Sequence, residues 1–331
     1  MSSDFQVIIA SYNRRENIVK LVNDINDCNP SPKNVIVVDA TVEENSALKE
    51  NANVIYLHNL RHKNQPYQRL VGAYAAESEY IIFMDDDLEI LDKGIFGDLV
   101  GLLRANNTVA VTAGIEYEGK TETKTFASSA IGKALLFLTG RPIVKQGQLG
   151  LIGHAGGIKS LEVSKTERLH GPVMGFKRSV FLKLPDPLFL SIFEQKMAIP
   201  EDKILSIRAL SYGSLLYLPK HVVKHPQIES TYFTSIYDHS ARVHFSRFLI
   251  NVELSNKNRR RNKELYLIHY RYYSFWRKII AFSRSIINPK SYAPKYKGFL
   301  LAEQWVANYL KGAIPVNDNI IKDAENDSRF H

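Results

Sequence analysis

The chain has 331 residues, 45% of them hydrophobic, which is enough for about two domains with buried cores. Its one cysteine, Cys28, excludes an internal disulfide and a cysteine-rich zinc site, so a secreted disulfide scaffold is ruled out. Lysine and arginine number 43 against 34 for aspartate and glutamate, and the net charge of +9 favours phosphates, nucleic acid or anionic lipid as partners.

The first hundred residues alternate short β-branched runs with longer mixed segments, a pattern typical of a parallel sheet with crossover helices. The run Tyr80–Met84 is wholly apolar, as expected for a strand that is covered on both faces. The sequence therefore predicts an α/β fold. Strands are predicted at residues 5–10, 35–39, 54–57, 80–84 and 109–115, and helices at residues 14–27, 67–76 and 95–104.

Residues 116–170 are less regular and rich in glycine, lysine and threonine, so we expect an insertion or loops there. Regular elements return with a strand predicted at residues 173–176 and a helix at residues 202–210. A last strand is predicted at residues 215–218 and is expected to stop at Pro219. No internal repeat is evident in the sequence.

Three carboxylates, Asp85, Asp86 and Asp87, directly follow the apolar strand at residues 80–84. Open α/β folds bind their ligands at the carboxyl ends of parallel strands. Adjacent carboxylates repel one another unless a cation or several donors compensate, and hard divalent ions prefer such oxygen ligands. The cluster is therefore a candidate cation site, while a solvated acidic loop that caps the next helix stays open.

With the residues at the other strand ends, this cluster resembles the inverting nucleotide-sugar glycosyltransferases of family 2, which have the GT-A fold. The resemblance spans residues 5–225 and implies a Rossmann-like, mostly parallel sheet with helices on both faces. It implies a catalytic domain at residues 1–225, whose halves at 1–115 and 116–225 bind donor and acceptor. A basic, aromatic helical region at residues 226–331 is expected to follow.

The resemblance also implies a donor site at the strand ends. Residues 7–14 resemble the family's first strand and donor loop, and residues 68–72 resemble its Ala-Arg-Asn-x-Gly helix start. Ala40 and Leu70 depart from the family pattern, where an acid and an asparagine are usual. Each match alone also fits a turn residue, a helix cap or a surface side chain. The implied donor-binding residues are Ala10, Ser11, Tyr12, Arg14, Asp39, Arg69, Asp85 and Asp86.

A divalent metal, Mn or Mg, is the cofactor that the resemblance implies. Asp85 and Asp87 match the family's Asp-x-Asp motif, and His225 ends a segment that resembles its closing strand. The metal ligands are therefore expected to be Asp87, Asp85 and His225. A neutral imidazole is a fair ligand for manganese and a poor one for magnesium. His154, in a glycine-rich stretch, is not expected to be a ligand.

Glu201 and Asp202 resemble the family's Glu-Asp motif at the start of a helix. Inverting transfer needs a carboxylate that takes the proton of the acceptor hydroxyl. Asp202 is the candidate catalytic base, and Glu201 is expected to hold the acceptor or orient that base. The two acids also suit a helix N-terminus on electrostatic grounds alone, so this simpler role stays open.

The implied reaction moves one sugar from a nucleoside-diphosphate sugar, with UDP as the family's common case, to a hydroxyl of a glycan or lipid-linked glycan. The Gln-x-x-Arg-Trp signature of processive synthases is absent from the sequence, which favours addition of a single sugar. Two alternatives stay open. One is a catalytically silent binding module. The other is a sugar nucleotidyltransferase, which residues 11–14 disfavour because they contain no glycine.

Positive charge is concentrated at residues 256–280, where eight basic residues, with Arg259, Arg260 and Arg261 among them, accompany one acid. Apolar residues recur there with helical spacing. Three roles stay open: a helix that packs its aromatic face on the preceding domain, a helix on an anionic membrane surface, and, least favoured, a nucleic-acid site. The apolar residues of the pattern are Leu265, Ile268, Tyr272, Phe275, Trp276 and Ile279.

The basic stretch loosely resembles the C-terminal helices of bacterial enzymes that build surface polysaccharide on a lipid carrier. This implies contact with the inner leaflet, and a homodimer through these helices stays open. No apolar run reaches the length of a spanning helix, and the N-terminus lacks the order of a signal peptide. We therefore expect a cytoplasmic protein, with peripheral attachment to the cytoplasmic face of the inner membrane as its alternative.

Overall fold

The structure is a computed structural model and describes residues 4–105, 107–118, 130–141, 143–156, 161–226, 235–257 and 263–329. The strands are β1 (Phe5–Ser11), β2 (Val35–Asp39), β3 (Val54–His58), β4 (Tyr80–Asp85), β5 (Glu89–Ile90), β6 (Thr108–Tyr117), β7 (Ser164–Thr166), β8 (Val173–Lys177) and β9 (Ser214–His225). The helices are α1 (Arg15–Asn26), α2 (Ser46–Lys49), α3 (Gln65–Ala75), α4 (Ile95–Arg104), α5 (Ala130–Leu138), α6 (Arg178–Phe181), α7 (Pro187–Glu194), α8 (Glu201–Ala209), α9 (Ile236–Lys257), α10 (Lys263–Ile287), α11 (Pro289–Leu310) and α12 (Ile320–Asp327).

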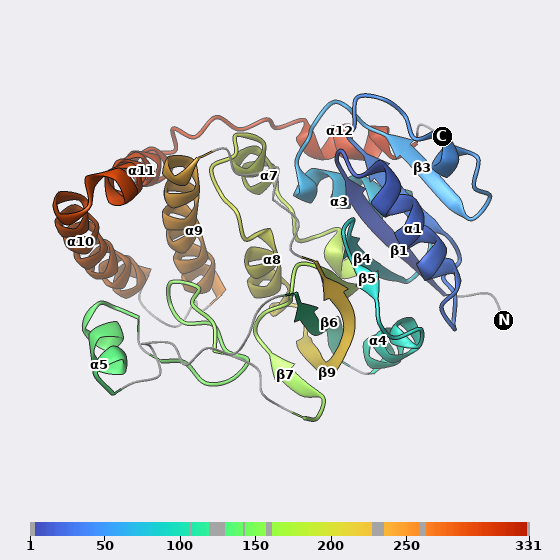
Figure 1. Ribbon diagram of the computed structural model, residues 1–331, viewed down its shortest axis with the longest axis horizontal. Coiled ribbons are helices and arrows are strands. Elements are labelled where there is room, and N and C mark those ends of the chain that lie inside the picture. The colour runs from blue at the N-terminus through green and yellow to red at the C-terminus, as the bar shows by residue number, and fades with distance from the viewer. Residues whose placement is uncertain are drawn as a thin grey trace.

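One mixed sheet of nine strands forms the centre of the fold, in the order β3-β2-β1-β4-β8-β6-β9-β5 with β7 beside β9 (Figure 1). The first four strands of this order run parallel to one another, as predicted. β8 runs antiparallel to both β4 and β6, so the parallel order ends there. The result is the GT-A arrangement of an α/β sheet that was expected.

Two hydrophobic cores lie on opposite faces of the sheet, because successive strand residues point to opposite sides. Val7 and Ile9 pack on one face with apolar residues of α1 and α4. Ile8 packs on the other face in a core that also includes residues of α3, α7 and α8. The predicted cover of helices on both faces is confirmed.

The predicted strands and helices of the first 210 residues are present with boundaries within two residues of the prediction. The strand expected to stop at Pro219 instead continues to His225, so that boundary is wrong. Opposite consecutive residues of β6, the register of β9 jumps from Leu218 to His221. This bulge leaves the proline out of the ladder, where its missing N–H does no harm. The irregular residues 116–170 contain two elements that were not predicted, α5 and β7.

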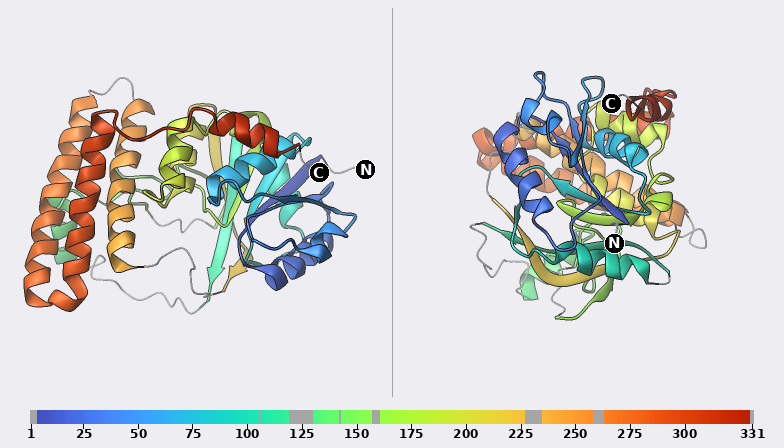
Figure 2. Two further views of the ribbon diagram at one scale, coloured as in Figure 1. Left: turned by 90° about the horizontal axis from the view of Figure 1, so that it is seen from above. Right: turned by 90° about the vertical axis from the view of Figure 1, so that its right-hand side faces the viewer.

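Three long helices, α9, α10 and α11, extend from one side of the sheet domain, with α10 and α11 running side by side at the end of the molecule (Figure 2). The chain then returns, and α12 lies beside α3 (Figure 1). There the Tyr67 hydroxyl donates to Asp327 Oδ2 at 2.6 Å. No helix within the described residues is long and apolar enough to cross a membrane.

Helix α10 does not pack its patterned apolar face on the preceding domain, which was one of the three roles that the sequence left open. Tyr266, Tyr270 and Tyr273 are its buried aromatic residues. The helix has two apolar faces, and its three buried tyrosines form the face that packs on α9 and α11. Five of the six residues of the apolar pattern instead point outward: Leu265, Ile268, Tyr272, Phe275 and Ile279 are between 40% and 59% exposed, whereas Trp276 is half-buried. Arg259, Arg260 and Arg261 lie outside the described residues.

Candidate active site

The carboxyl ends of β2, β1 and β4 meet at one edge of the sheet, which brings the predicted donor residues together. The parallel register pairs Ser11 with Asp39 and Ala10 with Asp85. The loop after β1 begins with exposed Tyr12 and continues into Asn13, whose φ of 57° is the left-handed conformation that asparagine tolerates. This turn redirects the chain into α1 at the sheet edge.

Asp39 is almost fully buried, and the fold fixes both of its oxygens. Its Oδ1 accepts a hydrogen bond from the Thr41 backbone N–H at 2.9 Å, and its Oδ2 accepts one from the Tyr56 hydroxyl at 2.8 Å. Beside it, the loops after β1 and β2 line an open groove that includes Arg14 and Thr41. Asp39 is thus a rigid carboxylate that supports Thr41 in the lining of the groove, while Asp39 itself is not among the lining residues.

Asp86 ties the loop after β1 to the acidic cluster. Its Oδ2 accepts hydrogen bonds from the Ser11 hydroxyl at 3.0 Å and from the Tyr12 backbone N–H at 3.2 Å. Burial raises the pKa of the Asp86 carboxyl to about 7, although the hydrogen bond from Ser11 works in the opposite direction. The position of Asp86 therefore determines the shape of the predicted donor loop.

Arg69 is the centre of the site and is 1% exposed. Its Nη2 donates to Asp85 Oδ1 at 2.8 Å and to the Gly171 carbonyl oxygen at 3.0 Å, while its Nη1 donates to Glu201 Oε1 at 2.8 Å. Asp85 Oδ1 also accepts from Gln65 Nε2 at 2.7 Å. One guanidinium thus joins the strand end of the donor half to the helix start of the acceptor half.

Asp87 and His225 face one another across the edge of the sheet. Their Oδ1 and Nε2 atoms lie 3.6 Å apart, and Asp87 Oδ1 is buried without a hydrogen bond. The other imidazole nitrogen, Nδ1, lies 3.0 Å from the Pro226 carbonyl oxygen. If Nδ1 carries the proton and donates it there, the lone pair of Nε2 points at Asp87. Burial raises the pKa of the Asp87 carboxyl, and His225 counteracts this.

A divalent cation fits these two residues, because an unpaired carboxylate oxygen and an imidazole nitrogen are both metal donors. Asp85, the third predicted ligand, turns one oxygen to Arg69 and Gln65 instead. Within the described ranges, no group of three His, Cys, Asp or Glu side chains is arranged to hold a metal ion. The protein donors therefore suffice for part of a coordination shell.

Glu201 and Asp202 open α8, as predicted, where Glu201 is buried and Asp202 is half-buried among charges. Burial raises the pKa of Glu201 to about 7, opposed by Arg69. Burial also raises the pKa of Asp202, opposed by Lys203 next to it. A Cβ atom on Gly171 would lie 3.9 Å from Asp202 Oδ2, so the glycine keeps that side of the carboxylate open. Asp202 can accept a proton there.

Three residues near the site were not predicted: Tyr117, Arg168 and Lys203. Tyr117 ends β6, its ring lies 5.6 Å from the ring of His225, and burial raises the pKa of its hydroxyl. Arg168 lies near Tyr117 and Asp202, and burial lowers the pKa of its guanidinium. The sequence signal for Tyr117 was its place at the carboxyl end of a strand. Arg168 lies in the irregular region and carried no such signal.

Residues 6–167 match the model of the family described as Glycosyl transferase family 2. No curated protein sequence matches the chain significantly. Among solved structures, the mannosyltransferase PcManGT from Pyrobaculum calidifontis, in complex with GDP-Man and Mn²⁺, has a TM-score of 0.50 and 12% identity, covering 94% of this chain and 88% of its own. TarS of S. aureus has a TM-score of 0.49 and 17% identity, covering 79% of this chain.

The chain spans 41% of the length of that TarS structure. At 12% identity, the likeness to the mannosyltransferase supports the fold alone. The family match covers the donor loop, the acidic cluster and Arg69. The family match and the sheet topology together show that residues 6–167 are similar to a family 2 glycosyltransferase domain.

Proposed function

We propose that the chain is a metal-dependent, inverting glycosyltransferase that moves one sugar from a nucleoside-diphosphate sugar to a hydroxyl of a glycan or lipid-linked glycan. The observation that carries this proposal is the double ion pair of Arg69 with Asp85 and Glu201. A fully buried cation that joins two halves of a site fixes the donor side and the acceptor side in one geometry.

The donor nucleotide is assigned to the groove between the loops after β1 and β2. Asp39 meets the base there, and Arg14, in the lining of the groove, faces the phosphates. Ser11, Tyr12 and Asp86 support this assignment because their hydrogen bonds fix the loop that forms one wall. Uridine is favoured as the common base of the family, and the neighbour solved with GDP-Man makes guanosine the second base to test.

Asp87 and His225 are the residues that hold the divalent cation, with Asp85 oriented beside them by Arg69. When bound, the cation neutralises the charge that builds on the departing diphosphate. Manganese suits the imidazole donor better than magnesium does, and Mn²⁺ is the ion present in the mannosyltransferase neighbour. Arg69 adds a fixed positive charge in the same region without any change of protonation.

Asp202 acts as the catalytic base. Its carboxylate takes the proton of the acceptor hydroxyl while that oxygen bonds to the anomeric carbon, and the bond from this carbon to the diphosphate breaks on the opposite face. Burial raises the pKa of Asp202, which brings its basicity closer to that needed near neutral pH. Glu201, held by Arg69, keeps the start of α8 and therefore Asp202 in place.

The test replaces Asp202 with Asn, which keeps the shape and removes the base. Transfer to a soluble acceptor is expected to fall by about 10²- to 10⁴-fold, while the dissociation constant of the donor stays within about twofold. Asp318→Asn, an exposed change before α12, is the matched control and should leave the rate unchanged. Equal transfer rates in the wild type and Asp202→Asn would favour the binding-module alternative.

We also propose that α10 holds the enzyme on an anionic membrane surface, at the cytoplasmic face of the inner membrane. Two exposed cations, Arg271 and Lys278, flank the outward apolar side of this helix. Residues 263–310 contain eight lysines and arginines against two acids, and one of these, Glu303, is hydrogen-bonded to Ser274. The outward apolar residues, spaced by three and four, are Leu265, Ile268, Tyr272, Phe275, Ile279, Phe282 and Ile286.

The charge on this helix favours lipid over a second copy of the chain. In a symmetric contact between two α10 helices, the flanking cations would face cations, whereas anionic headgroups neutralise them. Helix α5 adds exposed Leu135, Phe137 and Leu138 beside α10, where the Tyr272 hydroxyl donates to the Leu138 carbonyl oxygen. An apolar stripe with basic flanks is the pattern of an interfacial helix.

Sedimentation with vesicles of phosphatidylglycerol and phosphatidylcholine tests this attachment. Phe275→Glu should reduce binding to the vesicles by about tenfold or more, since it places a charge in the middle of the stripe. Leu60→Glu, an exposed change on the sheet domain, should not. A dimer that Phe275→Glu dissociates, in a protein that ignores vesicles, would assign the same face to a homodimer instead.

A further inference from the structure

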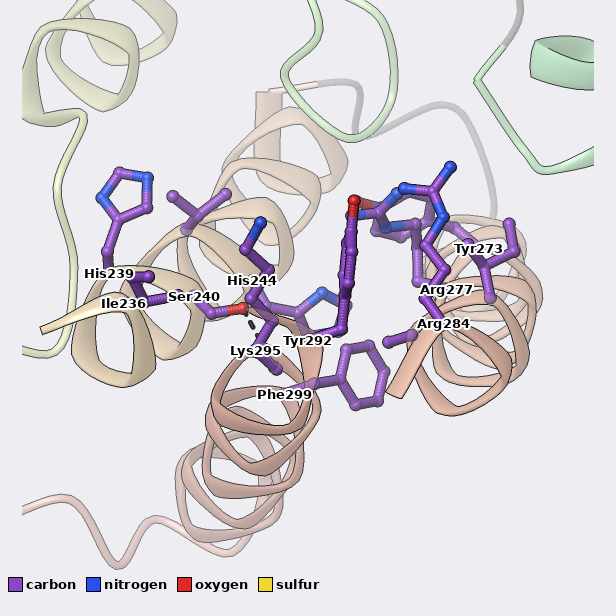
Figure 3. Close-up of a pocket in the computed structure, with 13 residues that line it drawn as sticks. Ile236, His239, Ser240, His244, Tyr273, Arg277, Arg284, Tyr292, Lys295 and Phe299 are labelled. Atoms are coloured by element: carbon purple, nitrogen blue, oxygen red, sulfur yellow. Dashed lines mark hydrogen bonds between the residues drawn. The ribbon is translucent and has the colours of Figure 1, made fainter. Parts of the chain in front are cut away.

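A pocket of about 290 Å³ lies among α9, α10 and α11, near the turn that joins α10 to α11 (Figure 3). Side chains from all three helices line it, and it is open on one side. It lies in the helical extension, apart from the strand ends where the sugar-transfer site is built (Figure 1). Neither the family match nor the proposed transfer reaction gives it a role.

Three cations converge on this pocket. Arg277 and Arg284 lie seven residues apart on α10, which is about two helical turns, so they share one face of that helix. Lys295 of α11 lines the same space. No carboxylate is among the lining residues, and no ion pair joins these cations to an acid in the described part of the chain. Their charges are therefore available to an anion.

Glu303 is an acid that contacts the lining residue His244, and it is engaged outside the pocket. It accepts a hydrogen bond from the Ser274 hydroxyl at 2.8 Å. Its Oε1 also lies 3.3 Å from His244 Nε2, a lining residue that stands between this acid and the pocket. Burial lowers the pKa of His244, which keeps this imidazole neutral near pH 7. Glu303 therefore interacts with Ser274 and His244 and makes no ion pair with the three cations.

Aromatic side chains hold the cations and form the walls. The ring centroid of Tyr292 lies 5.6 Å from Arg284 Cζ and 4.6 Å from Lys295 Nζ. Because both cations already pack against one ring, their side chains lose less conformational entropy on ligand binding than free side chains would. Tyr273 and Phe299 add apolar surface to the same space (Figure 3). The pocket thus combines a positive rim with apolar walls.

We propose that this pocket binds a phosphate group carried on a small organic body, as in an anionic phospholipid headgroup or a soluble phosphate monoester. The arginines supply planar donors for phosphate oxygens, and the lysine supplies a mobile third charge. The apolar walls cover the esterified carbons. Because the pocket is on the inner side of α10, it binds independently of the apolar stripe on the outer side of that helix.

Titration with glycerol 1-phosphate, followed by calorimetry on the full chain, tests the site. Arg284→Gln/Lys295→Gln should weaken binding by about tenfold or more, because each removes a charge-assisted hydrogen bond. Lys278→Gln is the matched control, since it removes one charge from the exposed side of the same helix. It should leave the affinity within about twofold. Equal losses in both variants would overturn the proposal. So would an absence of saturable binding both of glycerol 1-phosphate and of the vesicles described next.

A second arm distinguishes the two sources of the phosphate. Vesicles with and without phosphatidylglycerol are titrated against the wild type and Arg284→Gln/Lys295→Gln. Loss of vesicle binding in the double variant, without measurable affinity for glycerol 1-phosphate in the wild type, assigns the site to a lipid headgroup. Tight glycerol 1-phosphate binding with unchanged vesicle binding assigns it to a soluble ligand. Melting curves of each variant show that the fold is retained, and transfer to a soluble acceptor should be unaffected.

Discussion

The strand ends of the sheet and the helical extension are both rich in charge, yet the fold treats their charges in opposite ways. At the strand ends, Arg69 is fully buried and ion-paired with Asp85 and Glu201. In the extension, Arg277, Arg284 and Lys295 line a pocket that contains no carboxylate. Buried charges need partners because of their desolvation cost, whereas exposed charges are solvated by water and need no partner within the protein. This difference fits the proposals of catalysis at the strand ends and of ligand contact in the extension.

Replacing Arg69 is expected to have the largest effect on the free energy of unfolding, because it removes the charge that compensates the buried carboxylates. Arg69→Met keeps much of the volume and leaves two buried carboxylates unpaired, so it should lower the free energy of unfolding by about 3–5 kcal/mol. Urea denaturation measures this loss. Adding Glu201→Gln to the variant removes one orphaned charge and should recover part of the stability. If the double variant is no more stable than the single one, the buried pair is not what Arg69 supports.

Donor and metal binding at the strand ends can be tested through their effect on thermal stability. A nucleoside diphosphate at about 100 times its dissociation constant should stabilise the fold by roughly 2.7 kcal/mol. We expect this shift in melting temperature for one base among UDP, dTDP, GDP, CDP and ADP, and only when manganese is present. Asp87→Ala should abolish the part that depends on the metal, and Asp318→Asn should not.

A shift that is equal with and without manganese would count against Asp87 and His225 as ligands, while leaving the groove beside Asp39 as the nucleotide site. A shift lost in Asp87→Ala but not in His225→Gln would leave the carboxylate alone as protein donor. Both results would leave the proposed glycosyl transfer in place and change only the proposed cofactor geometry.

Half-buried His170 provides a pH test of the same region. Burial, and then the nearby Arg168, lowers the pKa of the His170 imidazole to about 4 from 6.5. Between about pH 6.5 and pH 4 the unfolded chain binds a proton that the folded chain does not, so stability falls as the pH falls through this window. His170→Gln should reduce that fall by about 1–3 kcal/mol. Exposed His221→Gln should keep the wild-type slope in urea unfolding at pH 7 and pH 4.5.

The sequence predicted the strand ends well, because short apolar runs and their polar ends mark a parallel sheet edge. Asp39, Asp85 and Ser11 meet there as the register of three strands requires. The partner of Arg69 could not be found in this way. Glu201 lies 132 residues further along the chain, and only the fold brings the two together.

Helix α10 shows a second reason why the sequence prediction was incomplete. Its helical spacing was correctly interpreted, but both of its faces are apolar, so the spacing alone could not decide which face turns inward. The tyrosines turn inward, where the Tyr270 hydroxyl finds His244 Nε2 at 3.2 Å. Buried tyrosines need such hydrogen bonds, and aliphatic residues do not. In the same way, Pro219 predicted a strand end. The β-bulge that accommodates this proline depends on how β9 pairs with β6, which the sequence of β9 alone does not indicate.

The smallest change in the free energy of unfolding is expected for substitutions on that outward face. Such substitutions distinguish a residue that binds a partner from one that stabilises the fold. Phe275 is 58% exposed, so Phe275→Ala should change the free energy of unfolding by less than about 0.5 kcal/mol. Tyr270, one turn and a half away on the same helix and 2% exposed, should cost about 3 kcal/mol when replaced by alanine. Vesicle binding should rank the pair in the reverse order, since Phe275 meets lipid and Tyr270 meets protein. If Phe275→Ala destabilises the fold as much as Tyr270→Ala does, another part of the protein covers this face, and α10 is a structural helix rather than a docking surface.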